Sequence, residues 1–224
     1  MTPRQRDKRA PFEKSVRTRA RILDAAAEVF SRQGYAGTRL SDIADEAGIK
    51  QGSLYYYFDS KDDLVEEMLA VGVQKTYAHV LETVEALGES ATELDKIRAA
   101  IEAHAESVVA RVGYTAASAR IVGQLPPQIR RKHISSHQRP YGKLWHELLV
   151  SARDAGAIGA ELDLEALRLL IIGALNWTVE WPSKIKRSPS EVSSILSSVI
   201  FDGISTPPKR RRNAASPKGN GSRR

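Results

Sequence analysis

Two short helical patterns meet at a glycine within residues 38–61, and this segment restricts the fold more than any other part of the chain. Gly48 stands at the junction, where a residue that is free to adopt positive φ allows a sharp turn. The second pattern opens on Lys50 and Gln51 and carries three consecutive tyrosines. Paired short helices with polar donors at the start of the second are typical of a helix-turn-helix. The sequence therefore predicts that this second helix enters a groove of DNA.

Small and polar residues at the start of the second helix suit contact with base edges. Gly52 and Ser53 allow the backbone to approach a base pair closely, and Lys50 and Gln51 supply hydrogen-bond donors. Successive helical residues turn by about 100°, so three adjacent tyrosines cannot all face inward. At least one tyrosine is therefore exposed, with its hydroxyl free to reach a phosphate. The apolar residues expected to pack the unit onto the preceding helix are Ile43, Ala44, Leu54 and Phe58.

The net charge of +7 is concentrated at the two ends of the chain. Residues 1–21 hold eight basic and two acidic side chains, and residues 206–224 hold seven basic side chains and no acidic one. The body between them is therefore net acidic. Basic arms suit a polyanion such as DNA, and we expect the N-terminal arm to contact DNA because it adjoins the predicted reader. For the C-terminal tail two interpretations stay open, a DNA contact or a segment that aids solubility.

Helical spacing dominates the chain from residue 16 to 205, without a useful strand pattern, which predicts an all-α protein. Gly34 is expected to end the first helix, and Pro126 and Pro127 to force a bend. Ser60 and Ser188 each begin a predicted helix as its cap. The expected helices cover about 15–33, 40–47, 51–58, a stretch from Ser60, 74–87, 93–111, 115–124, 139–155, 163–181 and 188–204. We divide the chain into an arm (1–15), a DNA-binding domain (16–76), a helical ligand-binding and dimerisation domain (77–205) and a disordered basic tail (206–224).

Absent features exclude several classes of protein. Without cysteine the chain has no disulfide, thiolate metal site or cysteine nucleophile. No apolar stretch precedes Ile22, so no secretory signal is visible, and the longest apolar run, Leu169 to Leu175, is too short to span a bilayer. We expect a soluble protein of the cytoplasm without a membrane partner. The first dozen residues are expected to be disordered.

Residues 16 to about 76 resemble the N-terminal domain of the TetR (tetracycline repressor) family of bacterial regulators. The matching residues run in order from Gly34-Tyr35 through Asp42-Ile43-Ala44, Ala47-Gly48 and Gly52 to Phe58, ending on Ser60-Lys61 before Leu64. The resemblance implies recognition-helix contacts at the start of the second helix and phosphate contacts on either side. The implied DNA-binding residues are Thr38, Ser41, Lys50, Gln51, Gly52, Ser53, Tyr55, Tyr56, Tyr57 and Lys61. Many members carry histidine where Tyr57 stands, so this position departs from the family pattern.

The resemblance also implies a helical C-terminal domain that dimerises and often encloses an inducer. The segment 163–181 is apolar on more than one side, which requires cover from two directions. The segment 188–204 carries a single apolar stripe formed by Val192, Ile195, Leu196, Val199 and Ile200. We therefore expect a homodimer through 163–181 and 188–204. A dimer suits the DNA reader too, because two readers related by a twofold axis recognise the half-sites of a palindromic operator.

The segment 176–182 resembles members of the family that sense acyl-CoA or lipid-derived thioesters. Basic residues near Pro126 either bind CoA phosphates or form a solvated turn, and the tryptophans either line a pocket or belong to the core. The candidate ligand-binding residues are Arg120, Trp145, Trp177 and Trp181, and the basic run is Arg130, Arg131 and Lys132, with Arg139 nearby.

Catalysis and metal binding are the weaker readings of the sequence. His133 and His137 have the spacing of half a metal site, with His146 and Glu147 beyond, but no HExxH motif or phosphate loop accompanies them. We therefore expect no enzyme activity, no metal and no cofactor. The favoured function is a homodimeric repressor that a small-molecule inducer, such as an acyl-CoA, releases from its operator. The alternative is a DNA-binding regulator without a small-molecule ligand, controlled by its abundance or by a protein partner.

Overall fold

A computed structural model of the chain describes residues 9–110, 112–185 and 187–202, and these residues form helices and turns without a β-strand. The all-α prediction is confirmed. None of the described helices is long and apolar enough to cross a membrane. The α-helices are α1 (Arg9–Gly37), α2 (Leu40–Glu46), α3 (Gln51–Leu54), α4 (Lys61–Glu85), α5 (Glu93–Ala110), α6 (Val112–Ile121), α7 (Pro127–His133), α8 (Arg139–Asp154), α9 (Leu164–Trp177) and α10 (Pro189–Phe201).

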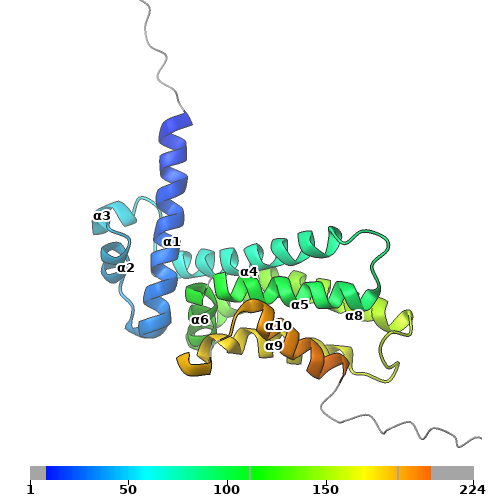
Figure 1. Ribbon diagram of the computed structural model, residues 1–224. Coiled ribbons are helices and arrows are strands. Elements are labelled where there is room, and N and C mark those ends of the chain that lie inside the picture. The colour runs from blue at the N-terminus through cyan, green and yellow to red at the C-terminus, as the bar shows by residue number, and fades with distance from the viewer. Residues whose placement is uncertain (1–8, 111, 186, 203–224) are drawn as a thin grey trace, which may run out of the picture.

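The first three helices form one unit around the apolar face of α1. Helices α2 and α3 lie on one side of α1, and the rest of the bundle lies on the other (Figure 1). Gly34 breaks α1 with φ +72°, as the sequence predicts, although the helix begins at Arg9 rather than near residue 15. Residues 9–12, expected to be disordered, are therefore helical. The core of this unit includes the fully buried Ile22, Phe30, Ile43, Leu54 and Leu64.

Helix α4 connects this unit with the rest of the molecule as one helix of 25 residues. The break expected near residue 73 is absent, and the predicted domain boundary at 76 falls inside the helix. Gly72 lies inside this helix, because a glycine weakens a helix by only about 1 kcal/mol and does not end it. A Cβ at Gly72 would lie 3.4 Å from the ring of Tyr114, so the glycine lets α6 pack closely against α4.

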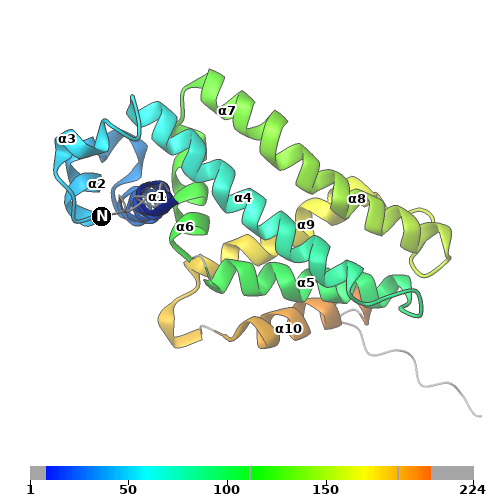
Figure 2. The same cartoon turned by 90° about the horizontal axis from the view of Figure 1, so that it is seen from above.

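The remaining helices build a second apolar core, which includes Ile97, Ile101, Trp145, Leu149 and Ile171. Pro126 precedes α7 and Pro127 occupies its first turn, so the predicted bend is present. A π-helical segment, Ile134–Gln138, joins α7 to α8, and the two helices follow one line beside α4 (Figure 2). Asp163 and Ser188 cap α9 and α10, and Ser188 completes a capping box with Glu191 as predicted.

Candidate DNA-binding and ligand-binding sites

The turn between α2 and α3 presents the predicted reader to solvent. Lys50, Gln51 and Ser53 are exposed at the start of α3, while Leu54 behind them is fully buried. Gly48 has φ +64°, which confirms its role in the turn. A Cβ placed at Gly52 would have no neighbour within 4 Å. The fold of the chain therefore does not require a glycine at this position, and the open space suits the approach of an external molecule.

The tyrosines follow α3 in a tight turn rather than lying within it. The helix has only four residues and ends at Leu54, whereas the sequence predicted a helix to residue 58. The amide of Tyr57 donates to the carbonyl of Leu54 over 2.9 Å, closing a turn of four residues, 54–57. This turn directs Tyr56 outward, with 82% of its surface exposed, and leaves Tyr55 half-exposed. Tyr57 is partly buried against the core, so Tyr55 and Tyr56 are the tyrosines available to a partner.

The side chains of Thr38 and Lys61 form hydrogen bonds to backbone carbonyls within the DNA-binding unit. Thr38 is 2% exposed, and its hydroxyl donates to the carbonyl of Gly34 over 2.7 Å. The ammonium of Lys61 donates to the carbonyls of Tyr35 (2.9 Å) and Thr38 (3.1 Å). It also lies 4.3 Å from the ring centroid of Tyr35. The side chain of Thr38 is therefore not available to DNA, and Lys61 ties the end of α1 to the start of α4. Ser41 is partly buried on α2.

Tyr35 adds a further link at the same junction. Its hydroxyl donates to the carboxylate of Asp62 at the start of α4. Burial raises the pKa of Tyr35 to about 12, and the hydrogen bond to Asp62 acts in the same direction. The phenol therefore stays protonated at physiological pH and remains a donor to this carboxylate.

Arg19 joins three parts of the DNA-binding unit, a role that sequence reasoning missed. Its guanidinium pairs with Glu67 of α4 and donates to the carbonyl of Tyr57 over 2.6 Å. It also lies 4.3 Å from the ring centroid of Phe58. The hydrogen bond to Glu67 raises the pKa of Arg19 above its ordinary value, so the charge is permanent. Arg19 therefore holds the tyrosine turn against α1 and α4. The sequence analysis also did not select Arg39, which is exposed immediately before α2.

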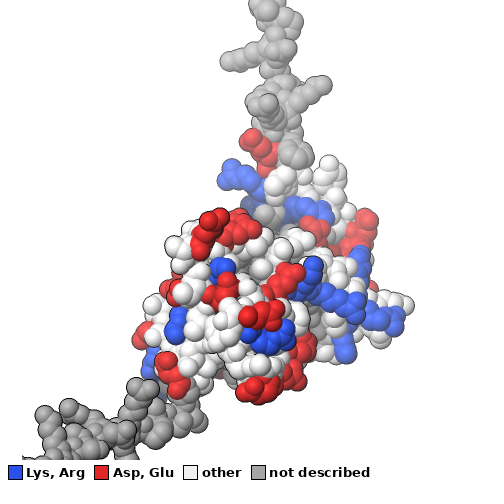
Figure 3. All heavy atoms as spheres, turned by 90° about the vertical axis from the view of Figure 1, so that its right-hand side faces the viewer, with Lys and Arg blue, Asp and Glu red and all other residues white. Residues whose placement is uncertain are grey.

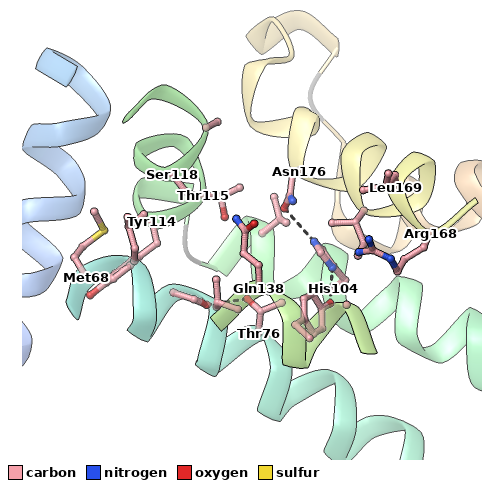
Figure 4. Close-up of a pocket in the computed structure, with 18 residues that line it drawn as sticks. Met68, Thr76, His104, Tyr114, Thr115, Ser118, Gln138, Arg168, Leu169 and Asn176 are labelled. Atoms are coloured by element: carbon pink, nitrogen blue, oxygen red, sulfur yellow. Dashed lines mark hydrogen bonds between the residues drawn. The ribbon is translucent and has the colours of Figure 1, made fainter. Parts of the chain in front are cut away.

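A cavity of about 270 Å³ lies between α4, α5, α6, α8 and α9 (Figure 4). Apolar side chains line part of its wall, and polar side chains line the remainder. Met68 and Tyr114 lie at one end of the view, and Arg168 and Leu169 lie at the other. The polar lining residues include Thr76, His104, Ser118, Gln138, Arg168 and Asn176. Because α4 forms part of the wall, the cavity borders the helix that carries the DNA-binding unit.

Buried hydrogen bonds connect α8, α5 and α9 across the cavity wall through Tyr141, His104 and Asn176. His104 Nε2 lies 3.1 Å from the amide oxygen of Asn176, and Nδ1 lies 2.6 Å from the hydroxyl of Tyr141. Nε2 therefore carries the proton, and Nδ1 accepts from the tyrosine. Burial lowers the pKa of His104 to about 4, and burial raises that of Tyr141. Both groups are thus neutral at physiological pH, and His104 and Tyr141 give this part of the wall hydrogen-bonding groups without a charge.

The four ligand-binding candidates from the sequence all lie outside this cavity. Trp145 is fully buried on the core side of α8, and Trp181 packs against the same core. Trp177 is 64% exposed, and Arg120 is exposed at the end of α6 near Gly34. These predictions missed the cavity because helical spacing alone does not reveal which face of each helix lines it. Arg168 was detectable as the lone basic residue of α9, and His104 as a polar residue among buried alanines.

The basic run and the histidine pair also lie away from the cavity. Arg130 and Arg131 are exposed on α7, and Lys132 pairs with Glu66 of α4. His133 is fully buried, and its Nε2 accepts from the amide of Gln138 over 3.1 Å. Among the residues that the structure describes, no group of three or more histidine or carboxylate side chains is gathered for a metal ion.

Apolar side chains are exposed along α9 and α10. Leu170 is 71% exposed, Leu169 is 56% exposed, and Ile195 and Val199 are each about half exposed. The end of the bundle farthest from α2 and α3 has a different surface, on which acidic and basic side chains intermix (Figure 3). The exposed leucines thus form an unpartnered apolar face, and the mixed-charge end suits contact with solvent.

A helix-turn-helix joined to a helical bundle that encloses a cavity defines a bacterial DNA-binding regulator with two sites. The family model described as bacterial regulatory proteins, tetR family, matches residues 22–68. The model described as the tetracyclin repressor-like C-terminal domain matches residues 90–204. The chain belongs to the TetR family.

Relatives and solved structures agree with this assignment. The HTH-type transcriptional repressor KstR2 of Rhodococcus jostii (strain RHA1) is 30% identical over 193 residues, which cover 84% of this chain and 92% of the relative. FadR from Bacillus subtilis in complex with stearoyl-CoA has a TM-score of 0.69 at 24% identity, over 83% of this chain and 99% of that chain. AibR in complex with isovaleryl coenzyme A and operator DNA has a TM-score of 0.68 at 19% identity, over 82% and 98% of the two chains.

Proposed function

We propose that the protein is a homodimeric transcriptional repressor that binds operator DNA through α3 and releases it when a small molecule fills the cavity. The observation that carries the proposal is the position of α4, which borders the cavity and continues into the DNA-binding unit. The name of KstR2 as a transcriptional repressor supports repression rather than activation. The cavity favours control by a ligand over control by abundance alone.

The proposed DNA contacts are the exposed residues around α3. Lys50, Gln51 and Ser53 donate to base edges or phosphates, and Gly52 allows close approach. Tyr55 and Tyr56 contact phosphates or sugars from the turn after α3. Arg39 adds a phosphate contact at the start of α2 that the sequence reasoning did not include. The proposed contact set is Arg39, Ser41, Lys50, Gln51, Gly52, Ser53, Tyr55 and Tyr56, with Thr38, Tyr57 and Lys61 as residues that position the unit.

The proposed dimer forms through the apolar faces of α9 and α10, within 163–181 and 188–204. The exposure of Leu170, Leu169 and Val199 supports this interface, because contiguous apolar faces of this kind mark interaction sites. Residues 203 and 204 lie outside the described part of the chain. Two copies would present two copies of α3 to the half-sites of a palindrome.

The proposed inducer is a lipid-derived metabolite, with an acyl-CoA as the first candidate. Two solved structures of the same fold were determined with acyl-CoA ligands, stearoyl-CoA and isovaleryl-CoA. A mixed apolar and polar cavity suits such a molecule. Ligand binding would change the position of α4 and hence the separation of the two readers. This requires that the ligand bind the two arrangements with different affinities.

Recovery of bound genomic fragments with the purified protein tests the DNA-binding role. A single recurrent palindromic sequence is the expected result, and random recovery would contradict sequence-specific binding. Gel-shift titration of that fragment then tests the residues. Gln51→Ala and Tyr56→Ala should each weaken binding about five- to 150-fold, since lost base or phosphate contacts cost about 1–3 kcal/mol. Lys143→Ala, on the exposed face of α8, serves as the control that keeps full affinity.

A further inference from the structure

We infer that Arg168 anchors the oxygen head of an amphipathic acyl ligand, whose chain extends along the cavity toward Met68 and Tyr114. This inference rests on the proposed ligand-binding role of the cavity and specifies which end of the ligand lies where. The shared chemistry is an acyl oxygen that accepts hydrogen bonds, and it has two sources, the carboxylate of a free fatty acid or the carbonyl of a CoA thioester.

The guanidinium of Arg168 is the sole cation among the described residues that line the cavity. Its side chain is only 17% exposed. Nε donates to Glu165 over 3.0 Å, and Nη2 pairs with the same carboxylate. Nη1 makes no hydrogen bond within the described part of the chain, although it belongs to a largely buried cation. A ligand oxygen is the kind of acceptor that this donor lacks.

Gly142 of α8 provides the space in which this guanidinium lies. A Cβ at Gly142 would stand 3.0 Å from Nη1 of Arg168 and 3.4 Å from its central carbon. Both residues line the cavity. A Cβ at position 142 would require the guanidinium to move by a few tenths of an ångström, so the glycine allows the guanidinium to lie directly against α8.

The two ends of the cavity differ in polarity in the way that an acyl ligand requires. Asn176 lines the wall about two helical turns beyond Arg168 on α9, and its oxygen is already used by His104, so its amide nitrogen is a further donor. The opposite end carries Met68, Leu69 and the ring of Tyr114 (Figure 4). The wall follows α4 from Met68 to Thr76, roughly 12 Å at the helical rise, which suits a chain of medium length.

Titration calorimetry of the full-length protein tests the inference without operator DNA. The probes are hexanoate, octanoate, decanoate and dodecanoate, their CoA thioesters, and 1-octanol as an apolar chain without an acyl oxygen. At least one acid or thioester should bind, and 1-octanol should bind at least tenfold more weakly than the acyl probe of equal length. Preference for acids or for thioesters identifies the source. Binding by none of the acyl probes, or equal binding of 1-octanol, would overturn the inference.

Substitutions at and near Arg168 test whether this residue binds the head group of the ligand. Arg168→Met should weaken the acyl probe about tenfold or more, because a charge-assisted hydrogen bond is lost. Glu165→Gln should tighten binding of the same probe severalfold, because a competing carboxylate is removed while the arginine remains. Arg153→Met removes a comparable exposed ion pair outside the cavity and should leave affinity unchanged. Unfolding midpoints check that each variant is folded. An unchanged affinity in a folded Arg168→Met protein, or weaker binding in Glu165→Gln, would contradict the assignment. None of these measurements uses DNA. A negative result would therefore contradict the ligand assignment and would not affect the separate test of operator binding.

Discussion

The hydroxyl of Tyr114 donates a hydrogen bond of 2.7 Å to the carboxylate of Asp24, which joins the cavity wall on α6 to α1 of the DNA-binding unit. The ring of Tyr114 lines the cavity and packs against Gly72 of α4. A ligand that touches this ring therefore contacts a side chain tied to α1. This pair offers a direct route from the cavity to the reader.

Tyr114→Phe keeps the ring and removes the link to Asp24. We expect unfolding free energy to fall by about 1 kcal/mol, because one partly buried hydrogen bond is lost. Ligand affinity should persist, while the ratio of operator affinities without and with inducer should fall severalfold. Tyr77→Phe is the matched control, since no hydrogen bond of that hydroxyl is found among the described residues. An undiminished ratio in Tyr114→Phe would show that the link carries no coupling.

Arg19→Met should weaken operator binding even though Arg19 need not touch DNA. The substitution removes the donor to the Tyr57 carbonyl and the partner of Glu67. The ion pair is partly exposed, so we expect a stability loss of only about 1 kcal/mol. The tyrosine turn would lose its support, and gel shifts should show weaker binding in a protein that remains folded. Arg32→Met, which breaks the exposed pair with Glu46, is the comparison variant. Equal operator affinity of the two variants would argue against a positioning role.

Stability should fall as pH is lowered from about 6.5 toward 4. Burial lowers the pKa of His104 and of His133 to about 4, while an unfolded histidine titrates near 6.5. The unfolded chain therefore binds more protons in this window, and each histidine contributes up to about 3 kcal/mol of stability that is present above the window. Urea unfolding at several pH values measures the slope, and His104→Gln should reduce it. A slope unaffected by that substitution would mean that His104 is not neutral and buried.

Leu170→Glu should separate the proposed dimer into monomers. Leu170 is 71% exposed on α9, so a charge there costs little in the monomer but would be buried at the interface. Light scattering after size exclusion gives the mass of the species. Leu87→Glu, at the end of α4, exposes a charge elsewhere and should leave the dimer intact. A dimer that survives Leu170→Glu would place the interface on another face.

The DNA-binding unit was predictable because its signals are local. Gly34 and Gly48 needed positive φ, and Ser60 marked a cap whose hydroxyl accepts from the amide of Asp63, three residues on. The cavity was not predictable in the same way, because it depends on the rotation of five helices against one another. Tryptophan suggested pocket walls, yet Trp145 packs in the core while Arg168 faces the cavity. The contacts of Lys61 were not predictable for a related reason, since only the fold brings the carbonyls of residues 35 and 38 to its ammonium.

The most direct test of the account measures operator affinity of the dimer by fluorescence anisotropy, without ligand and with a saturating acyl ligand. Coupling between sites is typically 1–3 kcal/mol, so the dissociation constant for DNA should rise about five- to 150-fold when the cavity is filled. The same dissociation constant in both titrations, with calorimetry proving that the ligand is bound, would contradict the claim that the cavity controls the reader.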